Sequence, residues 1–157
     1  MSEIKIIEGD NRISDARIAI IASSYNSFIV DRLVDGCIET LCNSGIDKQA
    51  ITLARVPGAF EIPIAAKKFA DTKKCHGIIS LGAVIRGETS HFDYICNECA
   101  SGLTTVALQT DIPVVFGVLT IDSVQQAEVR SGDGESNKGS EAAATIIEMI
   151  SVLGKID

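Results

Sequence analysis

Short apolar runs rich in β-branched residues alternate along this chain with longer segments of helical periodicity. Four of these runs have the length of buried strands, and they span residues 17–22, 51–56, 77–81 and 112–119. Nearly unbroken apolar runs are typical of strands that are covered on both faces. A shorter alternating run at 4–7 predicts one more strand, which could pair with this sheet or with the sheet of a neighbouring subunit.

Each buried run is followed by apolar residues that recur every three or four positions, as on one face of a helix. Helices are predicted for residues 27–42, 59–71, 91–109, 123–130 and 140–153. Pro63 fits only in the first turn of its helix, because proline lacks the N–H that later turns need. Repeated strand–helix alternation predicts right-handed crossovers and a parallel sheet. The predicted fold is therefore α/β, a flavodoxin-like three-layer sandwich with a central four-stranded parallel sheet and helices on both faces.

The composition is that of a globular chain with one core. Of 157 residues, 46% are hydrophobic and 22% are charged, and we expect a single domain over 1–157. A net charge of −7 argues against a general nucleic-acid binder, which needs a basic surface, but it allows one local anion site. No apolar run approaches the roughly 20 residues that span a bilayer. Residues 1–5 lack the pattern of a signal peptide, and five cysteines in such a chain favour reduced thiols, so we expect a cytoplasmic protein.

Chemically useful side chains gather where the predicted strands end. Ligands of open parallel sheets bind beyond the carboxyl ends of the strands. The four loops at these ends span residues 23–26, 56–61, 82–91 and 120–123. Tyr25 and Phe60, from the first two loops, could stack on the faces of a flat heterocycle, or they could cap the core.

His91 has two interpretations. Thr89 or Ser90 could begin the helix at 91–109, which would put His91 in its first turn. The positive end of a helix favours a neutral imidazole, which can accept a proton near pH 7. The alternative is a solvated or capping histidine, which is common on surfaces. The backbone N–H groups and hydroxyls of residues 87–90 suit a phosphate, but an ordinary strand-to-helix turn has the same pattern.

Two further patterns carry less chemistry. The polar, glycine-rich segment 131–139 contains Lys138 without the preceding Gly and following Ser or Thr of a phosphate-binding Walker loop, so we expect a flexible loop. Cys96 and Cys99 form a C-x-x-C inside a predicted helix, and no second ligand pair is spaced to complete a zinc site. Free thiols and no metal are therefore expected.

The loop motifs resemble those of the lumazine synthase family. V-P-G-A-F-E-I-P at 56–63 and L-G-A-V-I-R-G-E-T-S-H-F-D-Y at 81–94 stand at matching separation, and the likeness continues at 25–29, 114–120 and 137–139. The resemblance covers essentially the whole chain. It implies a transferase of riboflavin biosynthesis that condenses 5-amino-6-(D-ribitylamino)uracil with 3,4-dihydroxy-2-butanone 4-phosphate. The products would be 6,7-dimethyl-8-ribityllumazine, phosphate and water, without a cofactor or metal.

The resemblance also implies a role for each matching residue. His91 matches the residue that transfers protons, and Tyr25 matches the aromatic that stacks on the pyrimidine. The segment that holds the ribityl chain matches Ala59, Phe60 and Glu61. The backbone that lines the pyrimidine matches Ala83, Val84 and Ile85. The turn that contacts the phosphate matches Glu88 and Thr89. Groups that the adjacent subunit lends match Phe116, Arg130 and Lys138, with Arg130 gripping the phosphate.

The same resemblance implies an assembly. The family forms pentamers, often packed into icosahedral shells of sixty subunits, with active sites shared between adjacent subunits. Pentamer-only relatives can carry an insertion in the connection that corresponds to 130–138, and this chain has no extra residues there. The sequence therefore favours the shell.

Four departures from the family pattern lie near the implied site. Tyr25 stands where Phe or Trp is usual, Ala83 where a hydroxyl residue is common, and Val129 where an acid is common, and 131–136 also differs. They keep open an alternative, a catalytically weak shell protein or a paralogue that binds lumazine or flavin. A flavodoxin-like electron carrier is a third interpretation, but residues 23–28 lack the glycine of its phosphate loop.

Overall fold

The computed structural model describes residues 3–156, and its strands form one parallel sheet. The strands are β1 (Ile18–Ser23), β2 (Ile51–Val56), β3 (Gly77–Ile85) and β4 (Val114–Ile121). Their order across the sheet is β2-β1-β3-β4, which leaves β4 at an edge. The helices are α1 (Ser27–Asn43), α2 (Ile62–Asp71), α3 (His91–Thr110), α4 (Val124–Ser131) and α5 (Lys138–Lys155), with short 3₁₀ turns at Lys48–Ala50 and Ala59–Glu61.

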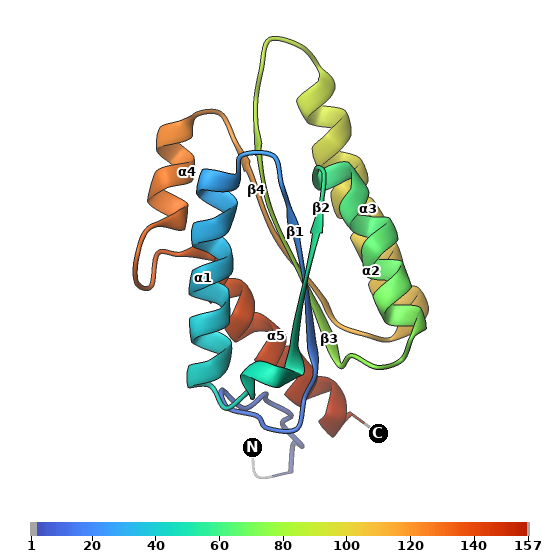
Figure 1. Cartoon of the computed structure of the whole chain (residues 1–157). Helices are drawn as coiled ribbons and strands as arrows, with labels where there is room; N and C mark the ends of the chain where they lie inside the picture. Colours follow the sequence, from blue (N-terminus) through green and yellow to red (C-terminus); the bar gives the residue numbers. More distant parts are fainter. Residues whose placement is uncertain (1–2, 157) are drawn as a thin grey trace.

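Two layers of helices cover the sheet (Figure 1). α1, α4 and α5 lie on one face, and α2 and α3 lie on the other. Ile20 of β1 packs in the core cluster that contains Leu33 of α1, whereas Ile21 packs in the cluster that contains Leu103 of α3. Neighbouring side chains of a strand point to opposite faces, so one apolar run serves both cores. The predicted three-layer sandwich is confirmed. Among the described residues, no helix combines the length and the apolar character of a membrane span.

β3 is longer than the sequence predicts. The apolar run indicates an end at Gly82, but the strand continues to Ile85. A Cβ on Gly82 would lie only 2.8 Å from Oγ of Ser23 in the neighbouring β1. Glycine at this position permits a close approach between strands and does not end one.

α5 begins earlier than predicted, because the residue before it is an effective cap. Oδ1 of Asn137 accepts the backbone N–H groups of Gly139 at 2.8 Å and Ser140 at 3.1 Å. Such a bond satisfies N–H groups that have no partner within the helix. Lys138 therefore lies in the first turn of α5 and not in a flexible loop, which corrects the predicted start at 140.

The predicted N-terminal strand at 4–7 is not formed within the described part of the chain. The next residues lie along α5: the backbone N of Asp10 donates to Oγ of Ser151 at 2.9 Å, and Nζ of Lys155 donates to the carbonyl of Glu8 at 2.8 Å. An alternating sequence becomes a strand only where a partner backbone takes up its hydrogen bonds. Pairing with a neighbouring subunit stays a prediction.

The strand order sets the position of the site. β1 lies between β2 and β3, and the chain passes from β1 to α1 on one face but from β3 to α3 on the other face. Where connections diverge in this way, a crevice opens beyond the carboxyl ends of the strands. Residues 24–26 and 86–91 follow the two diverging strands directly.

Candidate active site

The loop after β1 is tied to the ends of both neighbouring strands. The backbone N–H groups of Ser24 and Tyr25 donate to the carbonyl of Pro57, each at 3.1 Å. Asn26 has a left-handed backbone (φ 59°), and its Nδ2 donates to the carbonyl of Ala83 at 2.8 Å. Asparagine adopts this conformation more readily than most residues. These bonds tie the loop after β1 to the loop after β2 and to the last residues of β3 at one edge of the sheet.

Two aromatic side chains face solvent at this edge. Tyr25 is 68% exposed and Phe60 is 56% exposed, so neither caps the core and both are available to a ligand. The ring of Tyr25 lies against Gly58, where a Cβ would come within 2.8 Å of its Cδ2. The carboxylate of Glu61 accepts the N–H of Gly58 at 3.0 Å, which closes the turn beneath the ring.

His91 is the first residue of α3, as predicted from the helix periodicity. Oγ1 of Thr89 accepts its backbone N–H at 3.3 Å, and its side chain is exposed. The turn before it, residues 86–90, is exposed throughout, and a Cβ placed on Gly87 would meet no described atom within 4 Å. The side chain of His91 and the turn before it are therefore exposed to solvent beyond the carboxyl end of β3.

Arg86 is a member of this edge that the sequence pattern alone does not single out. Its Nε donates to Oδ1 of Asp122 at 2.9 Å, and its Nη1 donates to Oδ1 of Asp93 at 3.2 Å. Its guanidinium carbon lies 4.2 Å from the ring centroid of Phe92. The hydrogen bond to Asp122, followed by the contact with Asp93, raises the pKa of Arg86. The seven-residue separation of Arg86 and Asp93 is visible in the sequence, whereas the contact with Asp122 spans 36 residues.

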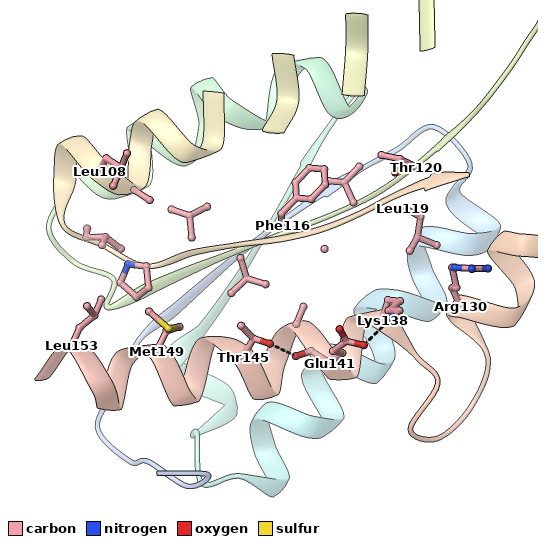
Figure 2. Close-up of a pocket in the computed structure, with 18 of the residues that line it drawn as sticks. Leu108, Phe116, Leu119, Thr120, Arg130, Lys138, Glu141, Thr145, Met149 and Leu153 are labelled. Carbon is pink, nitrogen blue, oxygen red and sulfur yellow. Dashed lines mark hydrogen bonds and ion pairs between the residues drawn. The ribbon is translucent and has the colours of Figure 1, made fainter. Parts of the chain in front are cut away.

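A second candidate region is a groove of about 1020 Å³ along β4, between α3 and α5. We call it the β4 groove (Figure 2). Phe116 of β4, Arg130 of α4 and Lys138 of α5 line it. Nζ of Lys138 contacts Oε2 of Glu141 at 2.6 Å, while Nη1 of Arg130 donates to a backbone carbonyl, that of Gln126, at 3.0 Å. The rest of its wall is largely apolar and includes Leu108, Leu119, Met149 and Leu153.

Comparison with known proteins decides the family. The family model described as 6,7-dimethyl-8-ribityllumazine synthase matches residues 15–154. A protein of Lawsonia intracellularis (strain PHE/MN1-00) named 6,7-dimethyl-8-ribityllumazine synthase is 47% identical over 156 residues, which cover 99% of this chain and 99% of that protein.

The chain belongs to the 6,7-dimethyl-8-ribityllumazine synthase family. Its implied lumazine synthase residues fall into two groups in the structure. The first, which we call the rim half-site, lies at the carboxyl ends of β1, β2 and β3, and comprises Tyr25, Ala59, Phe60, Glu61, Ala83, Val84, Ile85, Glu88, Thr89 and His91. The second comprises Phe116, Arg130 and Lys138 of the β4 groove. Among the described residues, the walls of that groove include no member of the rim half-site.

The cysteines of this lumazine synthase family member are free thiols. All five are free within the described part of the chain, as expected. Cys37 and Cys99 are buried, and burial raises the pKa of each thiol to about 12. A thiol is a metal ligand or nucleophile only as its thiolate, so these two are inert near neutral pH.

Proposed function

We propose that the rim half-site of one subunit and the β4 groove of its neighbour form one active site. The reaction follows from the family: the protein is a transferase of riboflavin biosynthesis, a 6,7-dimethyl-8-ribityllumazine synthase. It condenses 5-amino-6-(D-ribitylamino)uracil with 3,4-dihydroxy-2-butanone 4-phosphate and releases phosphate and water. The assignment of individual residues to steps of this reaction is our proposal.

One observation supports a shared site above all others. The four loops at the rim contain a single Lys or Arg, Arg86, and two carboxylates already share its charge. A phosphate substrate at the rim would need another cation. Arg130 lies in the β4 groove and, among the described residues, contacts a backbone carbonyl but no carboxylate within 4 Å. A free guanidinium can bind phosphate through two parallel, charge-assisted hydrogen bonds.

The rim supplies the remaining groups. Tyr25 stacks on the pyrimidine, the backbone of Ala83, Val84 and Ile85 lines it, and Ala59, Phe60 and Glu61 hold the ribityl chain. Glu88 and Thr89 form the turn beside the phosphate, where the N-terminus of α3 adds N–H donors and a favourable dipole. Phe116, with 44% of its surface exposed, and Lys138 complete the site from the neighbour.

The proposed chemistry requires orientation and proton transfer. The amine of the pyrimidine attacks the ketone, water leaves to form a Schiff base, and phosphate is eliminated. The second amine then attacks the remaining carbonyl and closes the ring with loss of a second water. Alignment of the two substrates supplies much of the acceleration, because reacting groups held in place have a high effective molarity. His91 then takes protons from the attacking amine and returns them to departing groups.

We also propose a homopentamer, assembled into a shell of sixty subunits and located in the cytoplasm. The exposed, largely apolar wall of the β4 groove is the kind of surface that a second subunit covers. Covering it would also protect the open edge of β4. The free thiols agree with a reducing compartment.

A fluorescence assay with both substrates tests the reaction, and mixed oligomers test the shared site. His91→Ala and Arg130→Ala chains are produced separately and together in one cell. In randomly mixed oligomers, about a quarter of the shared sites contain both an intact His91 and an intact Arg130. The activity of the mixture should therefore exceed the average activity of the two single-variant proteins. Arg130→Ala alone should mainly raise the KM of the phosphate substrate.

Two outcomes would contradict the proposal. A mixture with only the average activity of its parents would place both groups in the same protomer's site. Lumazine binding by the wild-type protein without product formation would favour a shell or binding paralogue instead.

A further inference from the structure

Arg86 connects the end of β3 with two other segments. Its own backbone N donates to the carbonyl of Ile121 at 2.9 Å, which continues the pairing of β3 with β4. Its side chain donates hydrogen bonds both to Asp93 in the first turn of α3 and to Asp122 after β4. The planar guanidinium suits this arrangement because it presents N–H groups in several fixed directions.

One branch reaches Asp93, two residues after His91. The contact between Arg86 and Asp93 spans seven residues and bridges the two ends of the exposed turn 87–91. The backbone N of Asp93 donates to the carbonyl of Ser90 at 3.0 Å, so this carboxylate belongs to the turn that begins α3. Phe92, beneath the guanidinium, is only 8% exposed and anchors the same turn in the core.

The other branch reaches the start of the helix that carries Arg130. The backbone N of Asp122 donates to Oε1 of Gln126 at 2.8 Å, and the N–H of Gln126 donates to Oγ of Ser123 at 3.2 Å. The carbonyl of Gln126 accepts Nη1 of Arg130 at 3.0 Å. A continuous series of contacts therefore runs from Arg86 through Asp122 and Gln126 to Arg130.

We propose that Arg86 is a positioning residue that serves two active sites. Through Asp93 it orients His91 of its own subunit's site, and through Asp122 it orients Arg130 for the site of the neighbour. The second part rests on the proposed shared site. Because the ion pairs are exposed, they contribute little to the free energy of unfolding. Their effect is on the placement of groups, to which turnover is far more sensitive.

Single-branch variants test this proposal with steady-state kinetics. Asp93→Asn should lower kcat and leave the KM of the phosphate substrate nearly unchanged. Asp122→Asn should raise that KM and leave kcat nearly unchanged. Arg86→Met, which keeps much of the packing on Phe92, should do both and lower kcat/KM by about 10- to 100-fold. Arg86→Lys should have a kcat/KM between those of Arg86→Met and the wild type. An ammonium keeps the positive charge, but it lacks the planar set of N–H groups that can contact both carboxylates.

Lys67→Met is the matched control. It removes another exposed cation that pairs with a carboxylate, Asp71 at 2.6 Å, on α2, and it should leave both constants unchanged. All variants should keep the melting temperature of the wild type within a few degrees.

Kinetic constants of Arg86→Met within twofold of the wild type would overturn the proposal. The proposal would also be overturned if Asp93→Asn and Asp122→Asn changed kcat and KM in the same way and lowered the melting temperature. Such a result would show a purely structural effect of both ion pairs. If Arg86→Met fails to fold, the kinetic constants of Asp93→Asn and Asp122→Asn still test the proposal. Failure of the wild type to make product would instead refute the proposed function itself.

Discussion

The rim half-site and the β4 groove differ in how much of their geometry one subunit sets. At the rim, hydrogen bonds such as those from Asn26 to Ala83 and from Gly58 to Glu61 hold the loops in place. In the β4 groove, Arg130 extends from the last turn of α4 and Lys138 from the first turn of α5. Both line an open, largely apolar wall. In the proposed shared site, a single subunit thus prepares the groups for pyrimidine binding and proton transfer, whereas the phosphate site depends on assembly.

The largest expected effect comes from the rim. His91→Ala should lower kcat by about 10²- to 10⁴-fold, the usual contribution of a general acid–base, while the KM of the phosphate substrate changes little. Residual turnover should persist because alignment of the substrates does not need the imidazole. Steady-state fluorescence measures both constants.

The second histidine provides the control for this experiment. His76 precedes β3 at the opposite end of the strand, where its Nδ1 accepts the N–H of Arg17 at 2.8 Å. His76→Ala should leave kcat unchanged. A kcat of His91→Ala within twofold of the wild type would remove the imidazole from the mechanism.

The two regions also differ in how far the sequence can predict them. Buried apolar runs predict all four strands of the sheet, and the rule that ligands bind beyond strand ends brings Tyr25, Phe60 and His91 to one edge. For Phe116, Arg130 and Lys138, the resemblance alone suggests a site. Periodicity shows which residues are exposed, but it does not show which exposed surface meets another subunit.

Three differences between the sequence-based picture and the structure have the same kind of cause. Alternation at 4–7 predicts a strand, but strand formation depends on a partner that the described chain does not supply. Gly82 resembles a strand end in the sequence, although its missing Cβ allows contact with Ser23. The role of Arg86 cannot be predicted from the sequence, because its partner Asp122 lies 36 residues away along the chain. Each of these three features concerns a contact between distant segments, whereas the earlier start of α5 comes from a local contact, the Asn137 cap.

A smaller effect should follow from displacing the aromatic at the rim. In Gly58→Ala the new Cβ would lie 2.8 Å from the ring of Tyr25, and this exposed ring can swing away without disturbing the core. Loss of one stacking contact should raise the KM of the pyrimidine substrate about two- to tenfold. The KM of the phosphate substrate should stay the same.

Gly154→Ala makes the same chemical change in α5, at a position where a Cβ meets no described atom within 4 Å. It should leave the kinetics unchanged and stabilise the helix by up to about 1 kcal/mol. If Gly58→Ala behaves like this control, stacking by Tyr25 contributes nothing to substrate binding.

The smallest expected effect tests whether the β4 groove is an anion site at all. Glu141 contacts Lys138 at 2.6 Å and lines the same groove, so it partly neutralises that charge. Glu141→Gln should therefore lower the KM of the phosphate substrate by about two- to fivefold, the range of an exposed ion pair, and added salt should reduce the difference. Glu148→Gln removes an equal charge from an exposed position two turns further along α5 and should change the KM less. An unchanged or raised KM in Glu141→Gln would mean that Lys138 does not face the phosphate, and Arg130 would then be the only cation that the neighbour contributes.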